Sequence, residues 1–273
     1  MSNLTQRIIT GIIGVSIMIG AILFSEYTLL LLLLLISVLG LLEFYRLCEN
    51  DSIQPQKAIG ILTAAVLFVP LILSSLLSIH LNLVPLLIIL PYLIFIRELY
   101  TKSTKPFTNI AYTLLGVIYI SVPLFLFYLT SVNNDAGNDT YHPKIILGYL
   151  FILWASDTGA YFAGRSLGRH KLFERISPKK TWEGSVGGTI LAFLVAFIIS
   201  KYYVDLSLKD WLVITVIIVV TGTLGDLVES LFKRSIHIKD SGEILPGHGG
   251  ILDRFDALFI SAPFVFFYFL MSR

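Results

Sequence analysis

Charged residues and cysteine are both scarce in this chain. Asp, Glu, Lys and Arg make up 14% of the 273 residues, whereas 56% are hydrophobic and the mean hydropathy is +0.83. Soluble domains carry about 25% charged residues, so the composition excludes an ordinary soluble protein and indicates an integral membrane protein. The single cysteine, Cys48, excludes an intrachain disulfide and a cysteine-rich metal site.

Long apolar runs, in contrast, fill most of the sequence. A helix that crosses a bilayer needs roughly 20 apolar residues. Nine runs approach that length, so we predict an all-α, polytopic membrane helix bundle of about nine transmembrane helices. The predicted spans are 8–25, 27–47, 58–79, 81–96, 110–130, 145–164, 186–204, 211–231 and 256–271.

The positions of the basic residues predict how this bundle is oriented. With nine spans, only four of the 20 Lys and Arg residues fall on one side: Lys144, Lys201, Lys209 and Arg273. Cytoplasmic loops of membrane proteins are enriched in Lys and Arg. We therefore predict that the N-terminus and the loops around residues 165–185 and 232–255 are cytoplasmic.

The two halves of the chain differ in polarity. Residues 1–130 have short loops and few charges inside the apolar runs, so we predict a transmembrane scaffold or oligomer region. Residues 131–273 contain most of the polar motifs and are predicted to form the catalytic region, with its two cytoplasmic loops.

The most polar stretch lies between two apolar runs, from Ser230 to Asp256. Ionisable groups at the edge of hydrocarbon are costly unless they are paired, hydrated or metal-bound, and they commonly mark a functional site. Those of this stretch are Lys233, Arg234, His237, Lys239, Asp240, Glu243, His248, Asp253, Arg254 and Asp256.

Two pairs of acidic residues lie at the two ends of this stretch, one just before it and one within its last turn, each with a spacing of three. Asp226 and Glu229 end one apolar run, and Asp253 and Asp256 begin the next. On a helix this spacing places both side chains on one face. Converging carboxylates repel each other unless a cation lies among them, and hard oxygen ligands suit Mg²⁺. The alternative is that Asp226 and Glu229 form ion pairs with the basic residues that follow them, Lys233 and Arg234.

Three further motifs are candidates for substrate contact. Asp157 lies within a predicted span, where an acid is rarely structural. Ser177, Lys179, Lys180 and Thr181 form a compact basic cluster beside Trp182, a combination that suits a nucleoside triphosphate with a base that can stack. In the turn around His248, Gly249 and Gly250 permit positive φ and backbone N–H groups that cradle an anion.

The order S-x-F-K-R, four residues, K-D-S-G and then L-P-G-H-G-G-I-x-D-R-F-D resembles the signature of the phosphatidate cytidylyltransferases, also called CDP-diacylglycerol synthases. Upstream, Ser156-Asp157, the Ser177–Thr181 block and Gly225-Asp226 are also similar to this family. The resemblance covers about residues 150–256, while the N-terminal half matches only in hydrophobic character.

The resemblance implies a nucleotidyltransferase that converts CTP and phosphatidic acid into CDP-diacylglycerol and pyrophosphate with Mg²⁺. It also implies Asp226 and Asp253 as metal ligands, and a second cation such as K⁺. Our hypothesis is that Lys233, Arg234, Lys239 and Arg254 neutralise phosphates, that Asp240 and Asp256 orient these cations or the metal's water shell, and that His248 donates to a phosphate oxygen. Substrate binding is assigned to Asp157, Ser177, Lys179, Lys180, Thr181, Gly249 and Gly250.

We expect a bacterial inner membrane location, membrane lipids and a second copy of the chain as partners (a homodimer), and no nucleic acid. Two other functions stay open. A lipid kinase of similar fold would also use a nucleotide, and an ion-coupled transporter would also contain buried acids. The absence of inverted repeats and the concentration of charge on one face disfavour a transporter.

Overall fold

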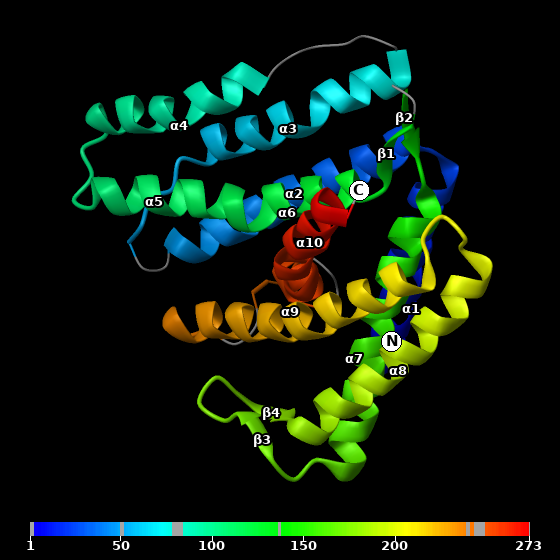
Figure 1. The fold of residues 1–273 in the computed structure, drawn as a ribbon. Helices are drawn as coiled ribbons and strands as arrows, with labels where there is room; N and C mark the ends of the chain where they lie inside the picture. The colour runs from blue at the N-terminus through cyan, green and yellow to red at the C-terminus, as the bar shows by residue number, and fades with distance from the viewer. Residues whose placement is uncertain are drawn as a thin grey trace. The chain divides into compact units, whose positions relative to one another are not determined.

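The structure is a computed structural model that describes residues 3–49, 52–77, 84–135, 138–238, 241–242 and 249–272. Within these ranges the chain is helical apart from two short hairpins (Figure 1). The elements are α1 (Asn3–Phe24), α2 (Glu26–Glu49), α3 (Lys57–Leu77), α4 (Val84–Leu99), α5 (Pro106–Gly116), η1 (Val117–Ser121), α6 (Val122–Leu129), β1 (Val132–Asp135), β2 (Asn138–Tyr141), α7 (Pro143–Leu167), β3 (Lys171–Phe173), β4 (Ser177–Thr181), α8 (Trp182–Tyr202), α9 (Leu208–Ser235) and α10 (Leu252–Ser272).

Each of the nine predicted spans corresponds to a helical segment, because α5, the π-helical turn η1 and α6 run on as one. Among the described residues, seven segments are long and apolar enough to cross a membrane. The other two are shorter: the apolar part of α1 is Ile8–Phe24, and α4 has 16 residues. The polytopic all-helical bundle is thus confirmed, while spanning by α1 and α4 and the cytoplasmic N-terminus stay predictions.

The chain forms two compact units. The first contains residues 1–125 and 236–255, and the second contains residues 126–235 and 256–273. The segment 236–255 is therefore part of the first unit. The proposed split into scaffold and catalytic region stays a prediction about function.

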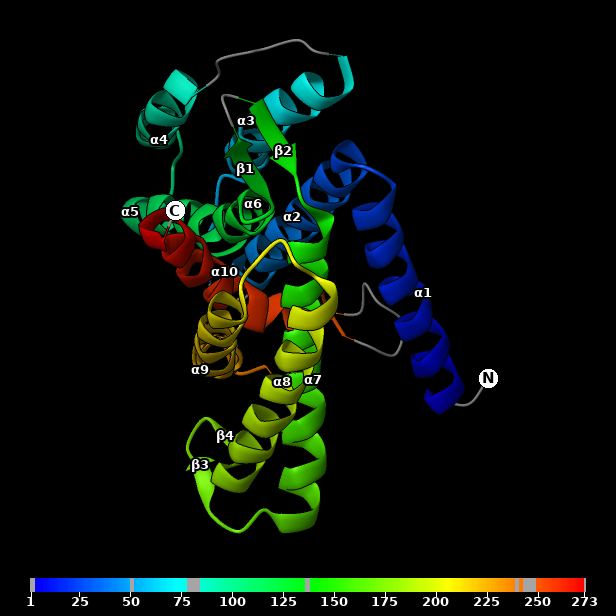
Figure 2. The ribbon, with the colours of Figure 1, turned by 45° about the vertical axis from the view of Figure 1, so that its right-hand side comes forward.

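The core of the first unit is formed by α2, α3 and α5, which lie side by side in Figures 1 and 2. Tyr45 of α2 is fully buried, and its hydroxyl donates a 2.8 Å hydrogen bond to the carbonyl of Thr113. Gly60 and Gly116 border the Tyr45 ring, and a Cβ at either position would overlap it. Large aromatic area is thereby buried against glycine backbone, which ties the three helices together.

The second unit is organised around α7 and α8, which pack along each other with the β3–β4 hairpin at their end (Figures 1 and 2). Along α8 a small residue recurs at every fourth position and each one is buried: Gly184, Gly188, Ala192 and Ala196. Small residues at this spacing allow two helix backbones to approach closely in a membrane. On α7, a Cβ at Gly159 would lie 2.7 Å from the carbonyl oxygen of Gly187.

Candidate active site

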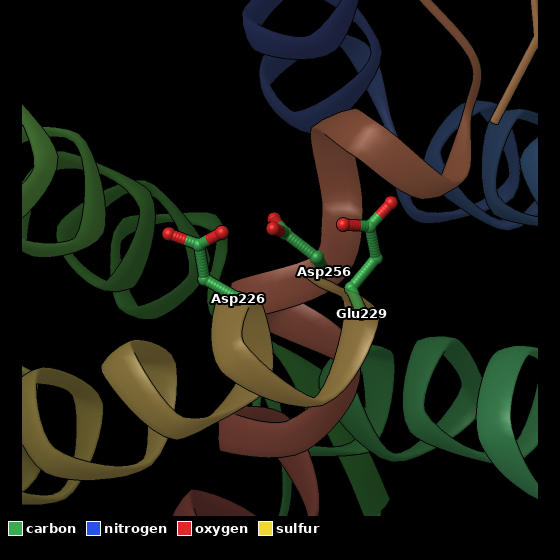
Figure 3. Close-up of side chains that lie close together, drawn as sticks. All are labelled: Asp226, Glu229 and Asp256. Atoms are coloured by element: carbon green, nitrogen blue, oxygen red, sulfur yellow. The ribbon is translucent and has the colours of Figure 1, made fainter. Parts of the chain in front are cut away.

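An acidic cluster lies in the second unit, where α9 and α10 meet. Asp226 and Glu229 come from α9 and Asp256 from α10, and one carboxylate oxygen of each lies within 4.8 Å of the others. In Figure 3 the carboxylate of Asp256 lies between those of the two α9 residues. The spacing of three therefore places Asp226 and Glu229 on one helix face, as the sequence predicted.

Gly225 permits the approach of α10 that brings Asp256 into the cluster. A Cβ at Gly225 would lie 2.5 Å from the carbonyl oxygen of Asp256 and 3.1 Å from the Cα of Ala257. Real Cβ atoms do not come so close to backbone, so only glycine fits here. At Gly222, one turn earlier, the nearest atoms would be 3.4 Å and 3.6 Å away, which is ordinary contact.

Two lysines provide counter-charge. Lys180 of β4 forms an ion pair with Asp226, and its Nζ donates a 3.4 Å hydrogen bond to the carbonyl of Thr223. Lys233 pairs with Glu229 at 2.6 Å. The alternative of ion pairing is thus realised for Glu229, whereas Asp226 pairs with a lysine from a different element. Three carboxylates and two lysines leave one negative charge in excess when all five are ionised.

This donor set fits a magnesium ion. Mg²⁺ takes oxygen ligands at about 2.1 Å, so two ligands on opposite sides of one ion lie about 4.2 Å apart. The three carboxylate oxygens lie within 4.8 Å of one another, close enough for small side-chain rotations to bring them to one ion. Glu229 is only 1% exposed, and a buried carboxylate needs cationic or hydrogen-bonding partners of this kind.

A cavity of about 460 Å³ lies within the same unit, and Asp226 is one of its lining residues. Four predicted substrate-binding residues line it: Asp157, Lys179, Lys180 and Thr181. The other lining residues are Ser156, Ala160, Tyr161, Gly164, Arg165, Gly184, Ser185, Gly222 and Thr223. The cavity thus combines basic side chains and hydroxyl groups next to the acidic cluster, a lining suited to phosphate groups.

Local contacts fix the hairpin that carries Lys179 and Lys180. Thr181 caps α8, since its Oγ1 accepts a 3.2 Å hydrogen bond from the backbone N–H of Gly184. Glu183 accepts hydrogen bonds from the backbone N–H groups of Arg169 and His170 and contacts the His170 ring at 2.6 Å. The lysines are therefore held on a short, anchored strand.

Two residues of the same motif lie outside the cavity lining. Ser177 pairs with Phe173 at the far end of the β3–β4 ladder, so it is remote in register from Thr181. Trp182 is 58% exposed. Stacking of a base on this ring, and substrate contact by Ser177, stay predictions.

Asp253 occupies a separate hydrogen-bonded arrangement in the first unit. Its Oδ2 accepts hydrogen bonds from the Ser241 backbone N–H at 3.1 Å, the Ser241 hydroxyl at 2.8 Å and the Gly250 N–H at 2.9 Å. Gly249 has φ +86°, as the predicted glycine turn requires. The role of Asp253 as a metal ligand stays a prediction, as does anion binding by the glycine turn.

The remaining predicted residues lie at helix ends or outside the described part. Arg234, in the last turn of α9, and Arg254, in the first turn of α10, are exposed. Lys239, Asp240 and His248 lie outside the described residues. The roles assigned to all five stay predictions.

Sequence analysis missed several residues of these sites. Tyr161 and Arg165 line the cavity, and the Arg165 guanidinium donates a 3.0 Å hydrogen bond to the Tyr161 hydroxyl. The sequence spacing could have revealed both residues, because they follow Asp157 at intervals of four and so share its helix face. Glu43 was also missed, because one acid inside an apolar run has no partner that local spacing reveals.

Comparison with known proteins identifies the chain's relatives. A model of the cytidylyltransferase family matches residues 5–272. The chain is 36% identical over 260 residues to the phosphatidate cytidylyltransferase of Staphylococcus haemolyticus, covering 94% of this chain and 95% of that protein. It is 33% identical over 273 residues to the Bacillus subtilis protein of that name, covering 98% of each, and 40% identical over 180 residues to the Haemophilus influenzae protein, covering 63% of this chain and 62% of that protein. The match extends through the N-terminal half, which the sequence motifs did not relate to this family. The chain belongs to the cytidylyltransferase family.

Proposed function

We propose that the protein transfers a cytidylyl group from CTP to phosphatidate and forms CDP-diacylglycerol and pyrophosphate. Its family supports this activity, and so do relatives named phosphatidate cytidylyltransferase that match nearly the whole chain. The structural observation that carries it is the acidic cluster of Asp226, Glu229 and Asp256 beside a lysine-lined cavity, in a protein built of membrane-spanning helices.

The reaction requires positioning of the two substrates and neutralisation of their phosphate charge more than it requires a general base. A phosphate oxygen of phosphatidate is already anionic; it bonds to the α-phosphorus of CTP while the bond to the β-phosphate oxygen breaks and pyrophosphate leaves. Phosphoryl-type transfer is accelerated mainly by placing the reactants in line and stabilising charge. The cationic side chains that border the cavity, Lys179, Lys180 and Arg165, serve that purpose for the triphosphate.

The acidic cluster is the proposed magnesium site. Bound Mg²⁺ would neutralise the phosphate oxygens and stabilise the charge that develops on the leaving pyrophosphate. Lys180 and Lys233 hold Asp226 and Glu229 in place by ion pairs. Asp253 is proposed as a further ligand, and a second cation such as K⁺ is proposed with it.

The location of the reaction follows from the solubility of the substrates. Phosphatidate is held in the bilayer by its acyl chains, whereas CTP is confined to water. Their phosphates meet only at the membrane interface. The enrichment of the predicted loops in Lys and Arg supports the cytoplasmic side of the bacterial cell membrane. We also propose a homodimer; the large apolar side chains exposed on α1 and α4 provide surface for lipid or for a second copy.

The activity is tested with purified protein in detergent, phosphatidate and CTP labelled in either the α- or the γ-phosphate. Label from the α-position should enter the lipid only when Mg²⁺ is present, and EDTA should abolish the reaction. Label from the γ-position in the lipid would instead identify a lipid kinase. Absence of any labelled lipid with Mg²⁺ present would leave the transporter as the better hypothesis.

A further inference from the structure

Glu43 is an acidic residue in the middle of the apolar N-terminal region, and it is only 5% exposed. Its carboxylate accepts hydrogen bonds from the backbone N–H of Ile251 at 2.8 Å, the backbone N–H of Leu252 at 3.2 Å and the hydroxyl of Ser241. We propose that Glu43 is a positioning residue for catalysis: it holds the two ends of the 241–252 segment together and thereby orients Asp253. This inference rests on the proposed function for its catalytic consequence.

The contacts of Glu43 join residues that are about ten positions apart in the sequence. Ser241 lies at one end of the segment, and Ile251 and Leu252 lie at the other, where α10 begins. Both ends are bonded to the same carboxylate, so α2 fixes the base of the segment that carries the predicted phosphate-binding turn. The negative charge of Glu43 also lies at the N-terminus of α10, where the helix dipole favours an anion.

Asp253 is linked to Glu43 through Ser241. The Ser241 hydroxyl lies within hydrogen-bond distance of Oε1 of Glu43 and of Oδ2 of Asp253. Its single proton can be donated to only one of these oxygens at a time. The backbone N–H groups of Ser241 and Gly250 also donate to Oδ2 of Asp253, so the direction of the Asp253 carboxylate depends on where Glu43 holds Ser241 and the start of α10.

The local packing is built for a carboxylate at position 43. A Cβ on Gly250 would lie only 1.9 Å from Glu43 Oε1, and a Cβ on Gly242 would lie 3.3 Å from the Cδ of Glu43. A glutamine would keep the shape but would direct an NH₂ group at N–H or O–H donors, leaving at least one buried donor unsatisfied. The arrangement therefore depends on the acid, and not only on the volume of the side chain.

Glu98 of α4 provides a matched control. It is also 5% exposed and belongs to the same unit, and it accepts 2.7 Å hydrogen bonds from the side-chain amides of Gln56 and Asn109. Glu98→Gln removes a buried carboxylate from the first unit but touches neither Ser241 nor α10. Both variants are compared with the unchanged protein by thermal unfolding, so that rates are measured only where each protein is folded.

Three readouts are expected to separate Glu43→Gln from Glu98→Gln. Glu43→Gln should lower kcat roughly 10- to 100-fold, as is typical for residues that orient metal ligands, and should raise the Mg²⁺ concentration that gives half-maximal rate. Hydrogen exchange should become faster at Ile251 and Leu252. Glu98→Gln should leave the Mg²⁺ dependence and the exchange at these two amides unchanged.

Ser241→Ala is the second, milder variant, and it keeps the test decisive if Glu43→Gln does not fold. It should raise the Mg²⁺ requirement by itself, and the double variant should be no worse than Glu43→Gln, because both changes break one linkage. Unchanged Mg²⁺ dependence in both variants, or unchanged exchange at Ile251 and Leu252 in Glu43→Gln, would overturn the proposal. If the unchanged protein makes no CDP-lipid, the proposed function fails, while the exchange measurement still decides whether Glu43 holds the segment.

Discussion

Carboxylates that are buried or partly buried occur in both units, but their charge is offset in different ways. In the first unit, Glu43 and Asp253 are surrounded by backbone N–H groups and the Ser241 hydroxyl. In the second unit, Asp226 and Glu229 are paired with the side chains of Lys180 and Lys233.

This difference indicates different tasks. Backbone donors are fixed by the fold, so a carboxylate that they bind becomes part of the framework and holds a segment in place. Lysine side chains have several rotatable bonds, so they can move from a carboxylate to a phosphate when substrate and metal bind. We therefore expect substitutions in the second unit to affect the reaction directly, and those in the first to act through geometry.

The largest effect is expected at Asp226. Asp226→Asn removes one charge from the acidic cluster and the partner of Lys180. Because a bound metal contributes several kcal/mol of charge stabilisation, turnover should fall by about 100-fold or more. The matched control is Asp210→Asn on the same helix, about 24 Å away along its axis, where the carboxylate bonds to Ser207 and Tyr268. Equal losses in the two variants would show that α9 needs its acids for folding alone.

A smaller but still large effect is expected from a substitution that forces α9 and α10 apart. Gly225→Ala adds a methyl group 2.5 Å from the carbonyl oxygen of Asp256, so α10 has to move and carry Asp256 away from the cluster. Overpacking of this kind costs about 1–3 kcal/mol of stability, and a shift of about 1 Å at a reacting centre can cost about 100-fold in rate. Rates and unfolding temperatures are measured for Gly225→Ala and for Gly222→Ala. The methyl group of Gly222→Ala meets only ordinary contacts, so this variant should unfold at the same temperature as the unchanged protein. A harmful Gly222→Ala together with a harmless Gly225→Ala would contradict the packing argument.

The smallest of these effects is expected at Lys180, the lysine that pairs with Asp226. Lys180→Met keeps an unbranched side chain of nearly the same length but removes the charged partner of Asp226 from the cavity. Hydrogen bonds to charged groups contribute about 1.5–3 kcal/mol, and since the side chain of Asp226 is 41% exposed, the low end applies. We expect kcat/KM for CTP to fall about tenfold. Lys201→Met, at the other end of α8 over the Phe197 ring, should leave it unchanged. A normal kcat/KM in Lys180→Met would remove this lysine from substrate binding.

Much of the architecture was readable from local sequence. Runs of apolar residues located the nine helical segments of the described ranges, because bilayer-crossing segments have to satisfy their backbone internally and so become helices. The β3–β4 hairpin was not predicted, since its alternation covers only a few residues between two helices. The unit boundary inside α10 was not predicted either, because composition does not change there.

Part of the candidate site could also be predicted from the sequence. Spacing alone placed Asp226 and Glu229 on one face, and the same rule paired Asp253 with Asp256. The structure puts Asp256 with the α9 acids and gives Asp253 hydrogen bonds to Ser241 and Gly250. Helical spacing gives the direction of a side chain but not which neighbouring element it meets.

The sequence by itself determined the membrane class, the helical segments, the family motif and the identity of the chemical groups, because hydropathy and residue type are local properties. Only the tertiary structure decided that Lys180 pairs with Asp226, that Arg165 and Tyr161 join the cavity, and that Glu43 holds Ser241 and the start of α10. These contacts join residues that lie far apart along the chain. Glycines leave room for two of the close approaches: Gly225 for the backbone of α10, and Gly250 for the carboxylate of Glu43.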